Sequence, residues 1–164
     1  MPAENKKIDL GLDVGSVSLN TILINEENEI LEEHYTRTGG QPLQTVLRVL
    51  TEVLKRYSRE RIDRVAVTGS GGKLIAELLG AEFINEIVAQ AKAVECLYPQ
   101  VRTIIDIGGE DSKLIILNSG SSGKLIIEDF SMNTICAAGT GSFLDQQAAR
   151  LGLSIEEEFG NLAL

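Results

Sequence analysis

The chain repeats one short pattern, in which an aspartate and a glycine, separated by one residue, stand at the end of an apolar run. Asp13 and Gly15 close the first such run, and Asp106 and Gly108 close the second, 93 positions further on. Two more extended segments with turn-forming residues between them follow each copy. Self-similarity at a fixed spacing indicates duplicated structural units. We therefore expect two related three-strand units, each carrying its aspartate at the same place.

The spacing of apolar residues predicts an α/β chain with the order β-β-β-α-β-α-β-α, after which the three-strand unit starts again. The predicted strands are 7–14, 18–25, 29–36, 65–67, 83–84, 103–107, 113–117 and 124–130, and the predicted helices are 42–57, 73–79, 87–98 and 142–151. In the first helix one wide apolar stripe is expected to face inward, formed by Leu43, Val46, Leu47, Leu50, Val53, Leu54 and Tyr57. In the third helix the residues expected inward are Ile87, Val88, Ala91, Val94 and Leu97.

This order divides the chain into two lobes. Residues 1–99 are expected to form the first lobe, and residues 100–164 the first part of a second lobe that lacks two strands and two helices of the pattern. We expect the chain to be a fragment of a longer polypeptide, the alternative being that a partner supplies the other half. On either interpretation the 164 residues alone are expected to bind a nucleotide poorly.

An Asp-x-Gly turn between two strands has a specific chemical use. Glycine lets the backbone approach a ligand closely, and exposed N–H groups then form a cradle for phosphate oxygens. The aspartate before the turn can hold Mg²⁺ through water, since Mg²⁺ prefers oxygen ligands and keeps several waters. A lone copy is more often a structural tight turn. The repeated copy favours two turns that grip the phosphates of a nucleotide from both sides, with Asp13 and Asp106 as metal-holding and catalytic residues.

Two other segments carry weaker signals. Gly69 to Lys73 lacks the glycine spacing of a P-loop, because position 67 is Val and Leu74 follows the lysine. It lies between a strand and a helix, so its amides either face an anion or simply connect the two elements. Asn85 and Glu86 start the next helix. They are either a cap with an acidic first turn or the place where Glu86 positions an attacking water.

Two cysteines cannot form a disulfide scaffold. Cys136 lies in a glycine-rich loop before a helix, where the helix dipole favours the thiolate that ligates iron or zinc. One cysteine without a CxxC pattern is, however, more often a small buried residue. Cys96 is expected in the core of its helix, and His34 at the surface.

Charge and hydropathy exclude several classes of partner. The formal net charge of −9 argues against nucleic acid, which is itself a polyanion. No apolar run approaches the ~20 residues that span a bilayer, and the charged start of the chain is unlike a signal peptide. A cytoplasmic protein without a membrane partner is expected.

The paired turns resemble the actin-like ATPase superfamily, which has a ribonuclease H-like α/β fold with a mixed sheet flanked by helices. Three motifs narrow the resemblance: LDVGSVS at 12–18, DIGGEDSK at 106–113 and NTICAAGTGSFL at 133–144. Together they are similar to the BadF/BadG/BcrA/BcrD ATPase family. That family includes activators of 2-hydroxyacyl-CoA dehydratases and ATPase subunits of benzoyl-CoA reductases.

The resemblance implies a homodimer that binds ATP or ADP with Mg²⁺ and shares one [4Fe–4S] cluster across its interface. ATP hydrolysis would drive an electron at low potential into a dehydratase or reductase component. Cys136 matches the first cluster ligand, while the second lies beyond Leu164 together with the adenosine-binding segment. A cluster is therefore not expected in these 164 residues alone. The expected nucleotide-binding positions are Gly11, Asp13, Gly15, Ser16, Val17, Ser18, Gly69, Gly71, Asp106, Gly108, Gly109, Lys113, Gly139, Thr140 and Gly141.

Two alternatives remain open from the sequence. One is a sugar or small-molecule kinase of the same superfamily, although no residue marks a hydroxyl-bearing substrate or its base. The other is a non-catalytic module that binds nucleotide only to set a partner interface.

Overall fold

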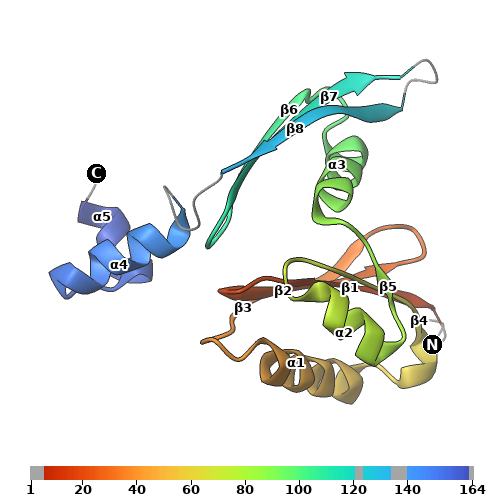
Figure 1. The fold of residues 1–164 in the computed structure, drawn as a ribbon. Helices are drawn as coiled ribbons and strands as arrows, with labels where there is room; N and C mark the ends of the chain where they lie inside the picture. Colours follow the sequence, from red (N-terminus) through yellow and green to blue (C-terminus); the bar gives the residue numbers. More distant parts are fainter. Residues whose placement is uncertain (1–5, 121–123, 134–139, 163–164) are drawn as a thin grey trace. The chain divides into compact units, whose positions relative to one another are not determined.

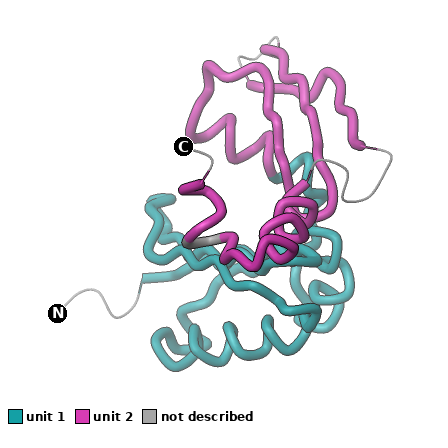
Figure 2. The backbone as a smooth tube through the Cα atoms, turned by 90° about the vertical axis from the view of Figure 1, so that its left-hand side faces the viewer, with its two compact units in different colours: residues 1–89 teal, residues 90–164 magenta. Residues whose placement is uncertain are grey.

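The computed structural model describes residues 6–120, 124–133 and 140–162, and its chain divides into two compact units, residues 1–89 and 90–164 (Figure 2). The division falls inside the helix Glu86–Leu97, before the lobe boundary expected at residue 99. The assignment of residues 100–164 to an incomplete lobe stays a prediction. None of the helices in the described ranges is long and apolar enough to cross a membrane.

The first unit is built on a five-stranded mixed sheet with the order β3-β2-β1-β4-β5. The first three strands pair antiparallel, and β1, β4 and β5 run parallel. Helices α1 and α2 cover one face of this sheet (Figure 1). The elements are β1 Ile8–Val14, β2 Ser18–Asn25, β3 Ile30–Arg37, α1 Pro42–Arg56, a 3₁₀ turn Arg59–Arg61, β4 Ile62–Thr68, α2 Gly72–Leu79 and β5 Glu82–Phe83.

Alternation along β1 decides which side chains enter the core. Ile8, Leu10, Leu12 and Val14 are buried against α1 and α2, while the residues between them face the opposite side of the sheet. Asp13 is therefore held at the end of β1 on the side away from the core. The rest of this core comes from β2, α1, β4 and α2, chiefly Leu19, Leu23, Val46, Val49, Val53, Val67, Ile75 and Ala76.

Helix α3, Glu86–Leu97, runs from the first unit into the second. The second unit contains a three-stranded antiparallel sheet of β6 Thr103–Ile107, β7 Ser112–Ser119 and β8 Leu125–Met132. It ends with α4 Gly141–Leu151, a π-helical turn Ile155–Phe159 and the short α5 Gly160–Leu162. The predicted α/β class and order of elements are thus confirmed, with the 3₁₀ turn and the last two helical turns as additions.

The duplication extends to the details of strand pairing. The β2–β3 ladder shifts register between Leu23 and Ile24, and the β7–β8 ladder shifts between Ile116 and Leu117, at the equivalent place 93 positions later. At each shift the pairing passes over one residue of the third strand, Leu31 in the first copy and Glu128 in the second, as in a β-bulge. The two units therefore share a local geometry as well as a sequence pattern.

The inward stripe predicted for α1 is wrong in part. Val46 and Val53 are buried as expected, together with Val49, which the prediction missed. These three positions form the i, i+3, i+7 line that faces the sheet. The buried stripe is narrower than predicted, because the residues on its flanks extend beyond the contact with the sheet. Leu50 and Tyr57 are partly buried there, while Leu43, Leu47 and Leu54 are exposed.

The inward face predicted for α3 is also wrong in part. Ile87 is buried, but Val88 and Leu97 are exposed. Cys96, expected in the core, is an exposed free thiol. The boundary between the two units falls within α3, and Ile87 is the buried residue of this helix, so its apolar residues do not form one buried stripe.

Candidate functional site: two equivalent aspartate–glycine turns

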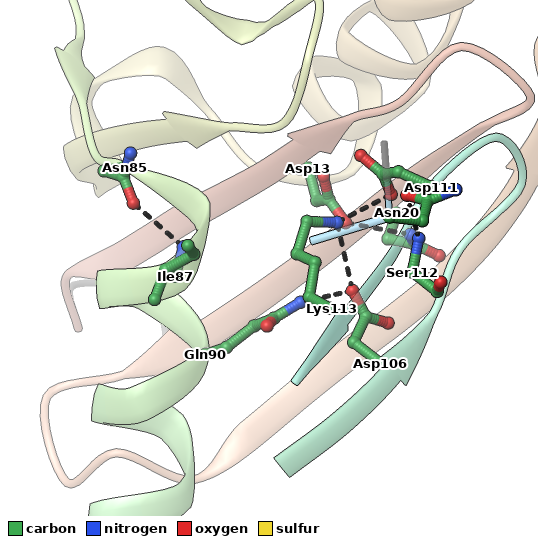
Figure 3. Close-up of polar contacts among 10 residues, drawn as sticks. Asp13, Asn20, Asn85, Ile87, Gln90, Asp106, Asp111, Ser112 and Lys113 are labelled. Atoms are coloured by element: carbon green, nitrogen blue, oxygen red, sulfur yellow. Dashed lines mark hydrogen bonds and ion pairs between the residues drawn. The ribbon is translucent and has the colours of Figure 1, made fainter. Parts of the chain in front are cut away.

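The first turn connects β1 to β2. The Gly15 N–H donates to the Ser18 carbonyl oxygen at 2.9 Å and closes the turn. Asp13 lies directly across the strand pair from Asn20, whose Nδ2 donates to Asp13 Oδ2 at 3.2 Å (Figure 3). The exposed Ser16, with Val17 and Ser18, forms the tip. The turn therefore places a carboxylate at the base of a short backbone loop, as its sequence predicts.

Thr38, which was not among the predicted site residues, stabilises this tip by hydrogen bonds. Its backbone N–H donates to the Val17 carbonyl oxygen at 2.9 Å, and its buried Oγ1 lies 2.7 Å from the Ser16 carbonyl oxygen. A threonine directly after the third strand of the unit, just before a glycine pair, is the signal that would have found it. Hydrogen bonds to the backbone carbonyls of a ligand-binding turn fix its conformation before the ligand binds.

The glycine loop after β4 packs against the same turn. Gly69 has φ +90°, and a Cβ there would lie 2.5 Å from Asp13 Oδ1 and 2.6 Å from the Val14 carbonyl oxygen. The Gly71 N–H donates to that carbonyl at 2.8 Å, and the Gly72 N–H donates to the Gly69 carbonyl at 3.0 Å. The loop thus supports the Asp13 turn. Contact of Gly69 or Gly71 with an anion stays a prediction.

Gly11 has a comparable steric reason to be glycine. A Cβ at this position would lie 2.7 Å from Cγ2 of Ile22 on the neighbouring strand. Gly11 and Asp13 line a cavity of about 530 Å³ on the sheet face opposite α1 and α2, along with Asn20, Ala66 and Thr68. The small side chains of Gly11 and Ala66 create this hollow beside the carboxylate, and its volume is that of a small-molecule pocket.

The second turn, between β6 and β7, reproduces the first. The Gly108 N–H donates to the Asp111 carbonyl oxygen at 2.9 Å, which is the equivalent of the Gly15–Ser18 bond. Asp106 lies across the strand pair from Lys113, the equivalent of Asn20. The Lys113 ammonium is 3.3 Å from Asp106 Oδ2 and 2.7 Å from Asp111 Oδ1 (Figure 3). The Asp-x-Gly unit is therefore duplicated in hydrogen bonding and in strand register.

Lys113 is the main electrostatic difference between the two turns. Only 2% of its side chain is exposed. A buried ammonium is tolerated where carboxylates compensate its charge, and Asp106 and Asp111 do so here. Gln90 on α3 adds a third polar group, because its Nε2 donates to Asp106 Oδ2 at 2.7 Å. Gln90 could not be found from the sequence, since nothing in the spacing along the chain relates it to Asp106.

The start of α4 lies against the second turn. The Gly141 N–H donates to the Gly108 carbonyl oxygen at 3.0 Å, and the Ser142 N–H donates to the Gly109 carbonyl oxygen at 2.8 Å. Thr140, at the N-cap position, is completely buried, and its hydroxyl has no hydrogen-bond partner in the described structure. Gly108, Gly109, Thr140 and Gly141 are thus brought together. Cys136 and Gly139 lie outside the described residues.

Asn85 caps α3, as one of the two sequence interpretations expected. Its Oδ1 accepts a hydrogen bond from the Ile87 N–H at 3.0 Å (Figure 3). Glu86 is the first residue of the helix. Its catalytic role stays a prediction.

The oxygen chemistry of both turns suits Mg²⁺. Both donors that reach Asp106, from Gln90 and Lys113, meet on Oδ2, and no described group donates to Oδ1. A carboxylate oxygen in a side chain that is 29% exposed is the type of ligand that Mg²⁺ takes. Within the described ranges no three His, Cys, Asp or Glu side chains cluster as a metal cage.

Comparison with known proteins gives consistent results. The 2-hydroxyisocaproyl-CoA dehydratase activator of Clostridioides difficile is 34% identical over 150 residues, which cover 90% of this chain and 54% of the activator. A crystal structure of component A of the Acidaminococcus fermentans (R)-2-hydroxyglutaryl-CoA dehydratase matches with a TM-score of 0.77 at 31% identity, over 91% of this chain and 56% of that one. The structure of the C. difficile activator with bound ADPNP matches with a TM-score of 0.74 at 33% identity, over 93% and 54%.

These structures confirm the expected actin-like ATPase fold. The chain spans about half the length of the curated relatives it matches. The profile of the BadF/BadG/BcrA/BcrD ATPase family matches residues 10–163, nearly the whole sequence. The chain therefore belongs to the BadF/BadG/BcrA/BcrD ATPase family.

Proposed function

We propose that this chain is the nucleotide-binding part of an ATPase that activates a CoA-thioester dehydratase or reductase component. The observation that carries the proposal is the duplicated turn, in which Gly15 and Gly108 make the same hydrogen bond and Asp13 and Asp106 have equivalent polar partners across the strands. Relatives at 34% and 35% identity are named as activators of such dehydratases, and one solved relative holds an ATP analogue.

Each group of the turns has a role in this proposal. The backbone of the glycine turns and Lys113 bind phosphate oxygens, and Asp13 and Asp106 hold Mg²⁺ through water. Mg²⁺, when bound, neutralises charge that develops on the transferred phosphoryl group. Glu86 positions the attacking water. Phosphoryl transfer depends mainly on positioning and electrostatics, which is the kind of support that the hydrogen-bonded turns give.

The electron-transfer part of the proposal rests on the segment around Cys136. In the full-length protein two copies of the chain would form a homodimer in the cytoplasm, with Cys136 of each as a ligand of one [4Fe–4S] cluster. When bound, the cluster supplies one electron at low potential. A four-iron cluster normally takes four thiolates, so a symmetric dimer needs two from each copy.

Asp106→Asn in the full-length protein tests the proposal. The amide keeps the shape of the side chain but removes the charge that holds Mg²⁺. We expect kcat for ATP hydrolysis to fall by about 10² or more, the scale seen when a positioned electrostatic group is lost. A melting curve checks that the variant is folded, because the change also removes a carboxylate that compensates the charge of the buried Lys113. Asp63→Asn is the matched control, because Asp63 is an exposed residue of β4. Unchanged turnover in Asp106→Asn would refute the assignment.

A further inference from the structure

Gln90 reaches the carboxylate of the second turn from a helix and not from the hairpin. It lies in the second turn of α3, and its Nε2 donates to Asp106 Oδ2 at 2.7 Å, shorter than the 3.3 Å from Lys113 Nζ to the same oxygen. Figure 3 shows the Gln90 side chain extending from α3 to this carboxylate. Both donors act on Oδ2, so together they set the direction in which Oδ1 points.

The orientation of the Gln90 amide follows from this contact. A carboxylate only accepts hydrogen bonds, so the NH₂ group must face Asp106 and the carbonyl oxygen must face away. That oxygen, Oε1, is buried and has no donor in the described part of the chain. Buried polar atoms without a partner are rare in proteins and call for an explanation. Gln90 and Asp106 line a cavity of about 340 Å³ together with Tyr98 and the apolar residues Ala93, Val94, Leu97, Ile104 and Ile105, so a water in it would take its polar partners from Gln90 and Asp106.

We infer that Gln90 is a positioning residue for the hydrated metal: its amide N–H fixes the Asp106 carboxylate, and its Oε1 accepts a hydrogen bond from a water in the shell of the ion that Asp106 holds. The inference deepens the proposed function and rests on it. Mg²⁺ keeps several of its waters when it binds a protein, and a metal-bound water is a strong hydrogen-bond donor. Residues that orient a metal ligand in this way commonly change metal affinity or activity 10–100-fold when they are replaced.

The test uses Gln90→Leu in the full-length protein, since leucine keeps the bulk and removes both polar ends. Calorimetry measures ADP binding in EDTA and then the affinity of the ADP complex for Mg²⁺, and steady-state kinetics give kcat and KM for ATP. We expect Mg²⁺ affinity to fall about 10-fold or more. ADP binding without metal should stay within about threefold of wild type, and kcat should fall with little change in KM.

Lys92→Leu is the control, because its side chain lies on the same helix and is 67% exposed. It should behave as wild type in all three measurements. If Gln90→Leu does not fold, Gln90→Asn carries the same test, since its amide is one methylene too short to keep the 2.7 Å contact. Wild-type Mg²⁺ affinity and kcat in a folded Gln90 variant would overturn the inference alone. A wild-type protein that does not bind Mg-ADP would overturn the proposed function as well.

Discussion

Gly69 shows how one residue supports the first turn without belonging to it. Its φ of +90° is a conformation that side-chain-bearing residues rarely adopt, and the space where a Cβ would stand is already filled by Asp13 Oδ1 and the Val14 carbonyl. A methyl group there must push the Asp13 turn away. The position therefore links the backbone of the β4–α2 loop directly to the carboxylate proposed to hold Mg²⁺.

Gly69→Ala should for this reason cost more stability than an ordinary glycine replacement. Gly80, at the end of α2, also has a positive φ of +62°, but no atom lies within 4 Å of where its Cβ would stand. Gly80→Ala therefore measures only the cost of holding alanine at a positive φ. We expect about 1 kcal/mol for Gly80→Ala and at least about 2 kcal/mol for Gly69→Ala, measured by urea unfolding. If both variants lose the same unfolding free energy, the Asp13 turn moves aside for the added methyl group at no measurable cost.

At the scale of elements, Glu32 ties β3 to the end of α1. Its carboxylate accepts a hydrogen bond from the Tyr57 hydroxyl at 2.7 Å and forms an ion pair with Arg56 at 2.9 Å, and the His34 ring nitrogen lies 3.0 Å away. Burial raises the pKa of the Glu32 carboxyl, but the hydrogen bonds from His34 and Tyr57 and the charge of Arg56 outweigh it, so the pKa lies below its ordinary value. The same hydrogen bond raises the pKa of Tyr57.

A lowered pKa in the folded state gives a defined pH dependence. The stabilisation from Glu32 is fully present above the unfolded pKa, about 4.3, and is lost as the pH falls through the lower folded value. We expect the difference in unfolding free energy between wild type and Glu32→Gln to be largest above about pH 5 and to shrink on acidification. Glu33→Gln removes the same charge from the opposite face of β3. If Glu33→Gln shows the same pH dependence of the unfolding free energy, the dependence comes from negative charge on β3 in general and not from the contacts of Glu32 with Tyr57, Arg56 and His34.

At the scale of the whole molecule, replacing each of the two cysteines in turn tests the proposed iron–sulfur cluster. In the full-length protein, purified without oxygen, Cys136→Ser should abolish the visible iron–sulfur absorbance, since a thiolate ligand is lost. Mg-ATP binding should persist, because the phosphate turns lie on other segments. Cys96→Ser is the matched control, since Cys96 is an exposed thiol of α3, and it should keep the absorbance. Full iron content in Cys136→Ser would mean that Cys136 is only a small packed residue.

Most of the fold was predictable because it depends on local pattern. Alternation in β1 and the glycine and asparagine turns after it predict the three-strand unit, and the 93-residue offset predicts its second copy. The candidate site was predictable to the same extent, since Asp13, Gly15, Asp106 and Gly108 occupy equivalent places in the two hairpins. Side-chain burial on the helices was less predictable. Leu47 and Cys96 have apolar character that suits a core, but only the packed sheet decides which side of a helix is covered.

The sequence alone determined the elements, their order, the duplication and the position of each aspartate at the end of a strand, because backbone propensity and a period of two act over a few residues. Only the tertiary structure decided that Gly69 lies against Asp13, that Thr38 fastens the tip of its turn, and that Gln90 reaches Asp106 from another element. These contacts join residues 16 to 56 positions apart. They follow from where helices and loops pack on the sheets, which no local pattern of residues specifies.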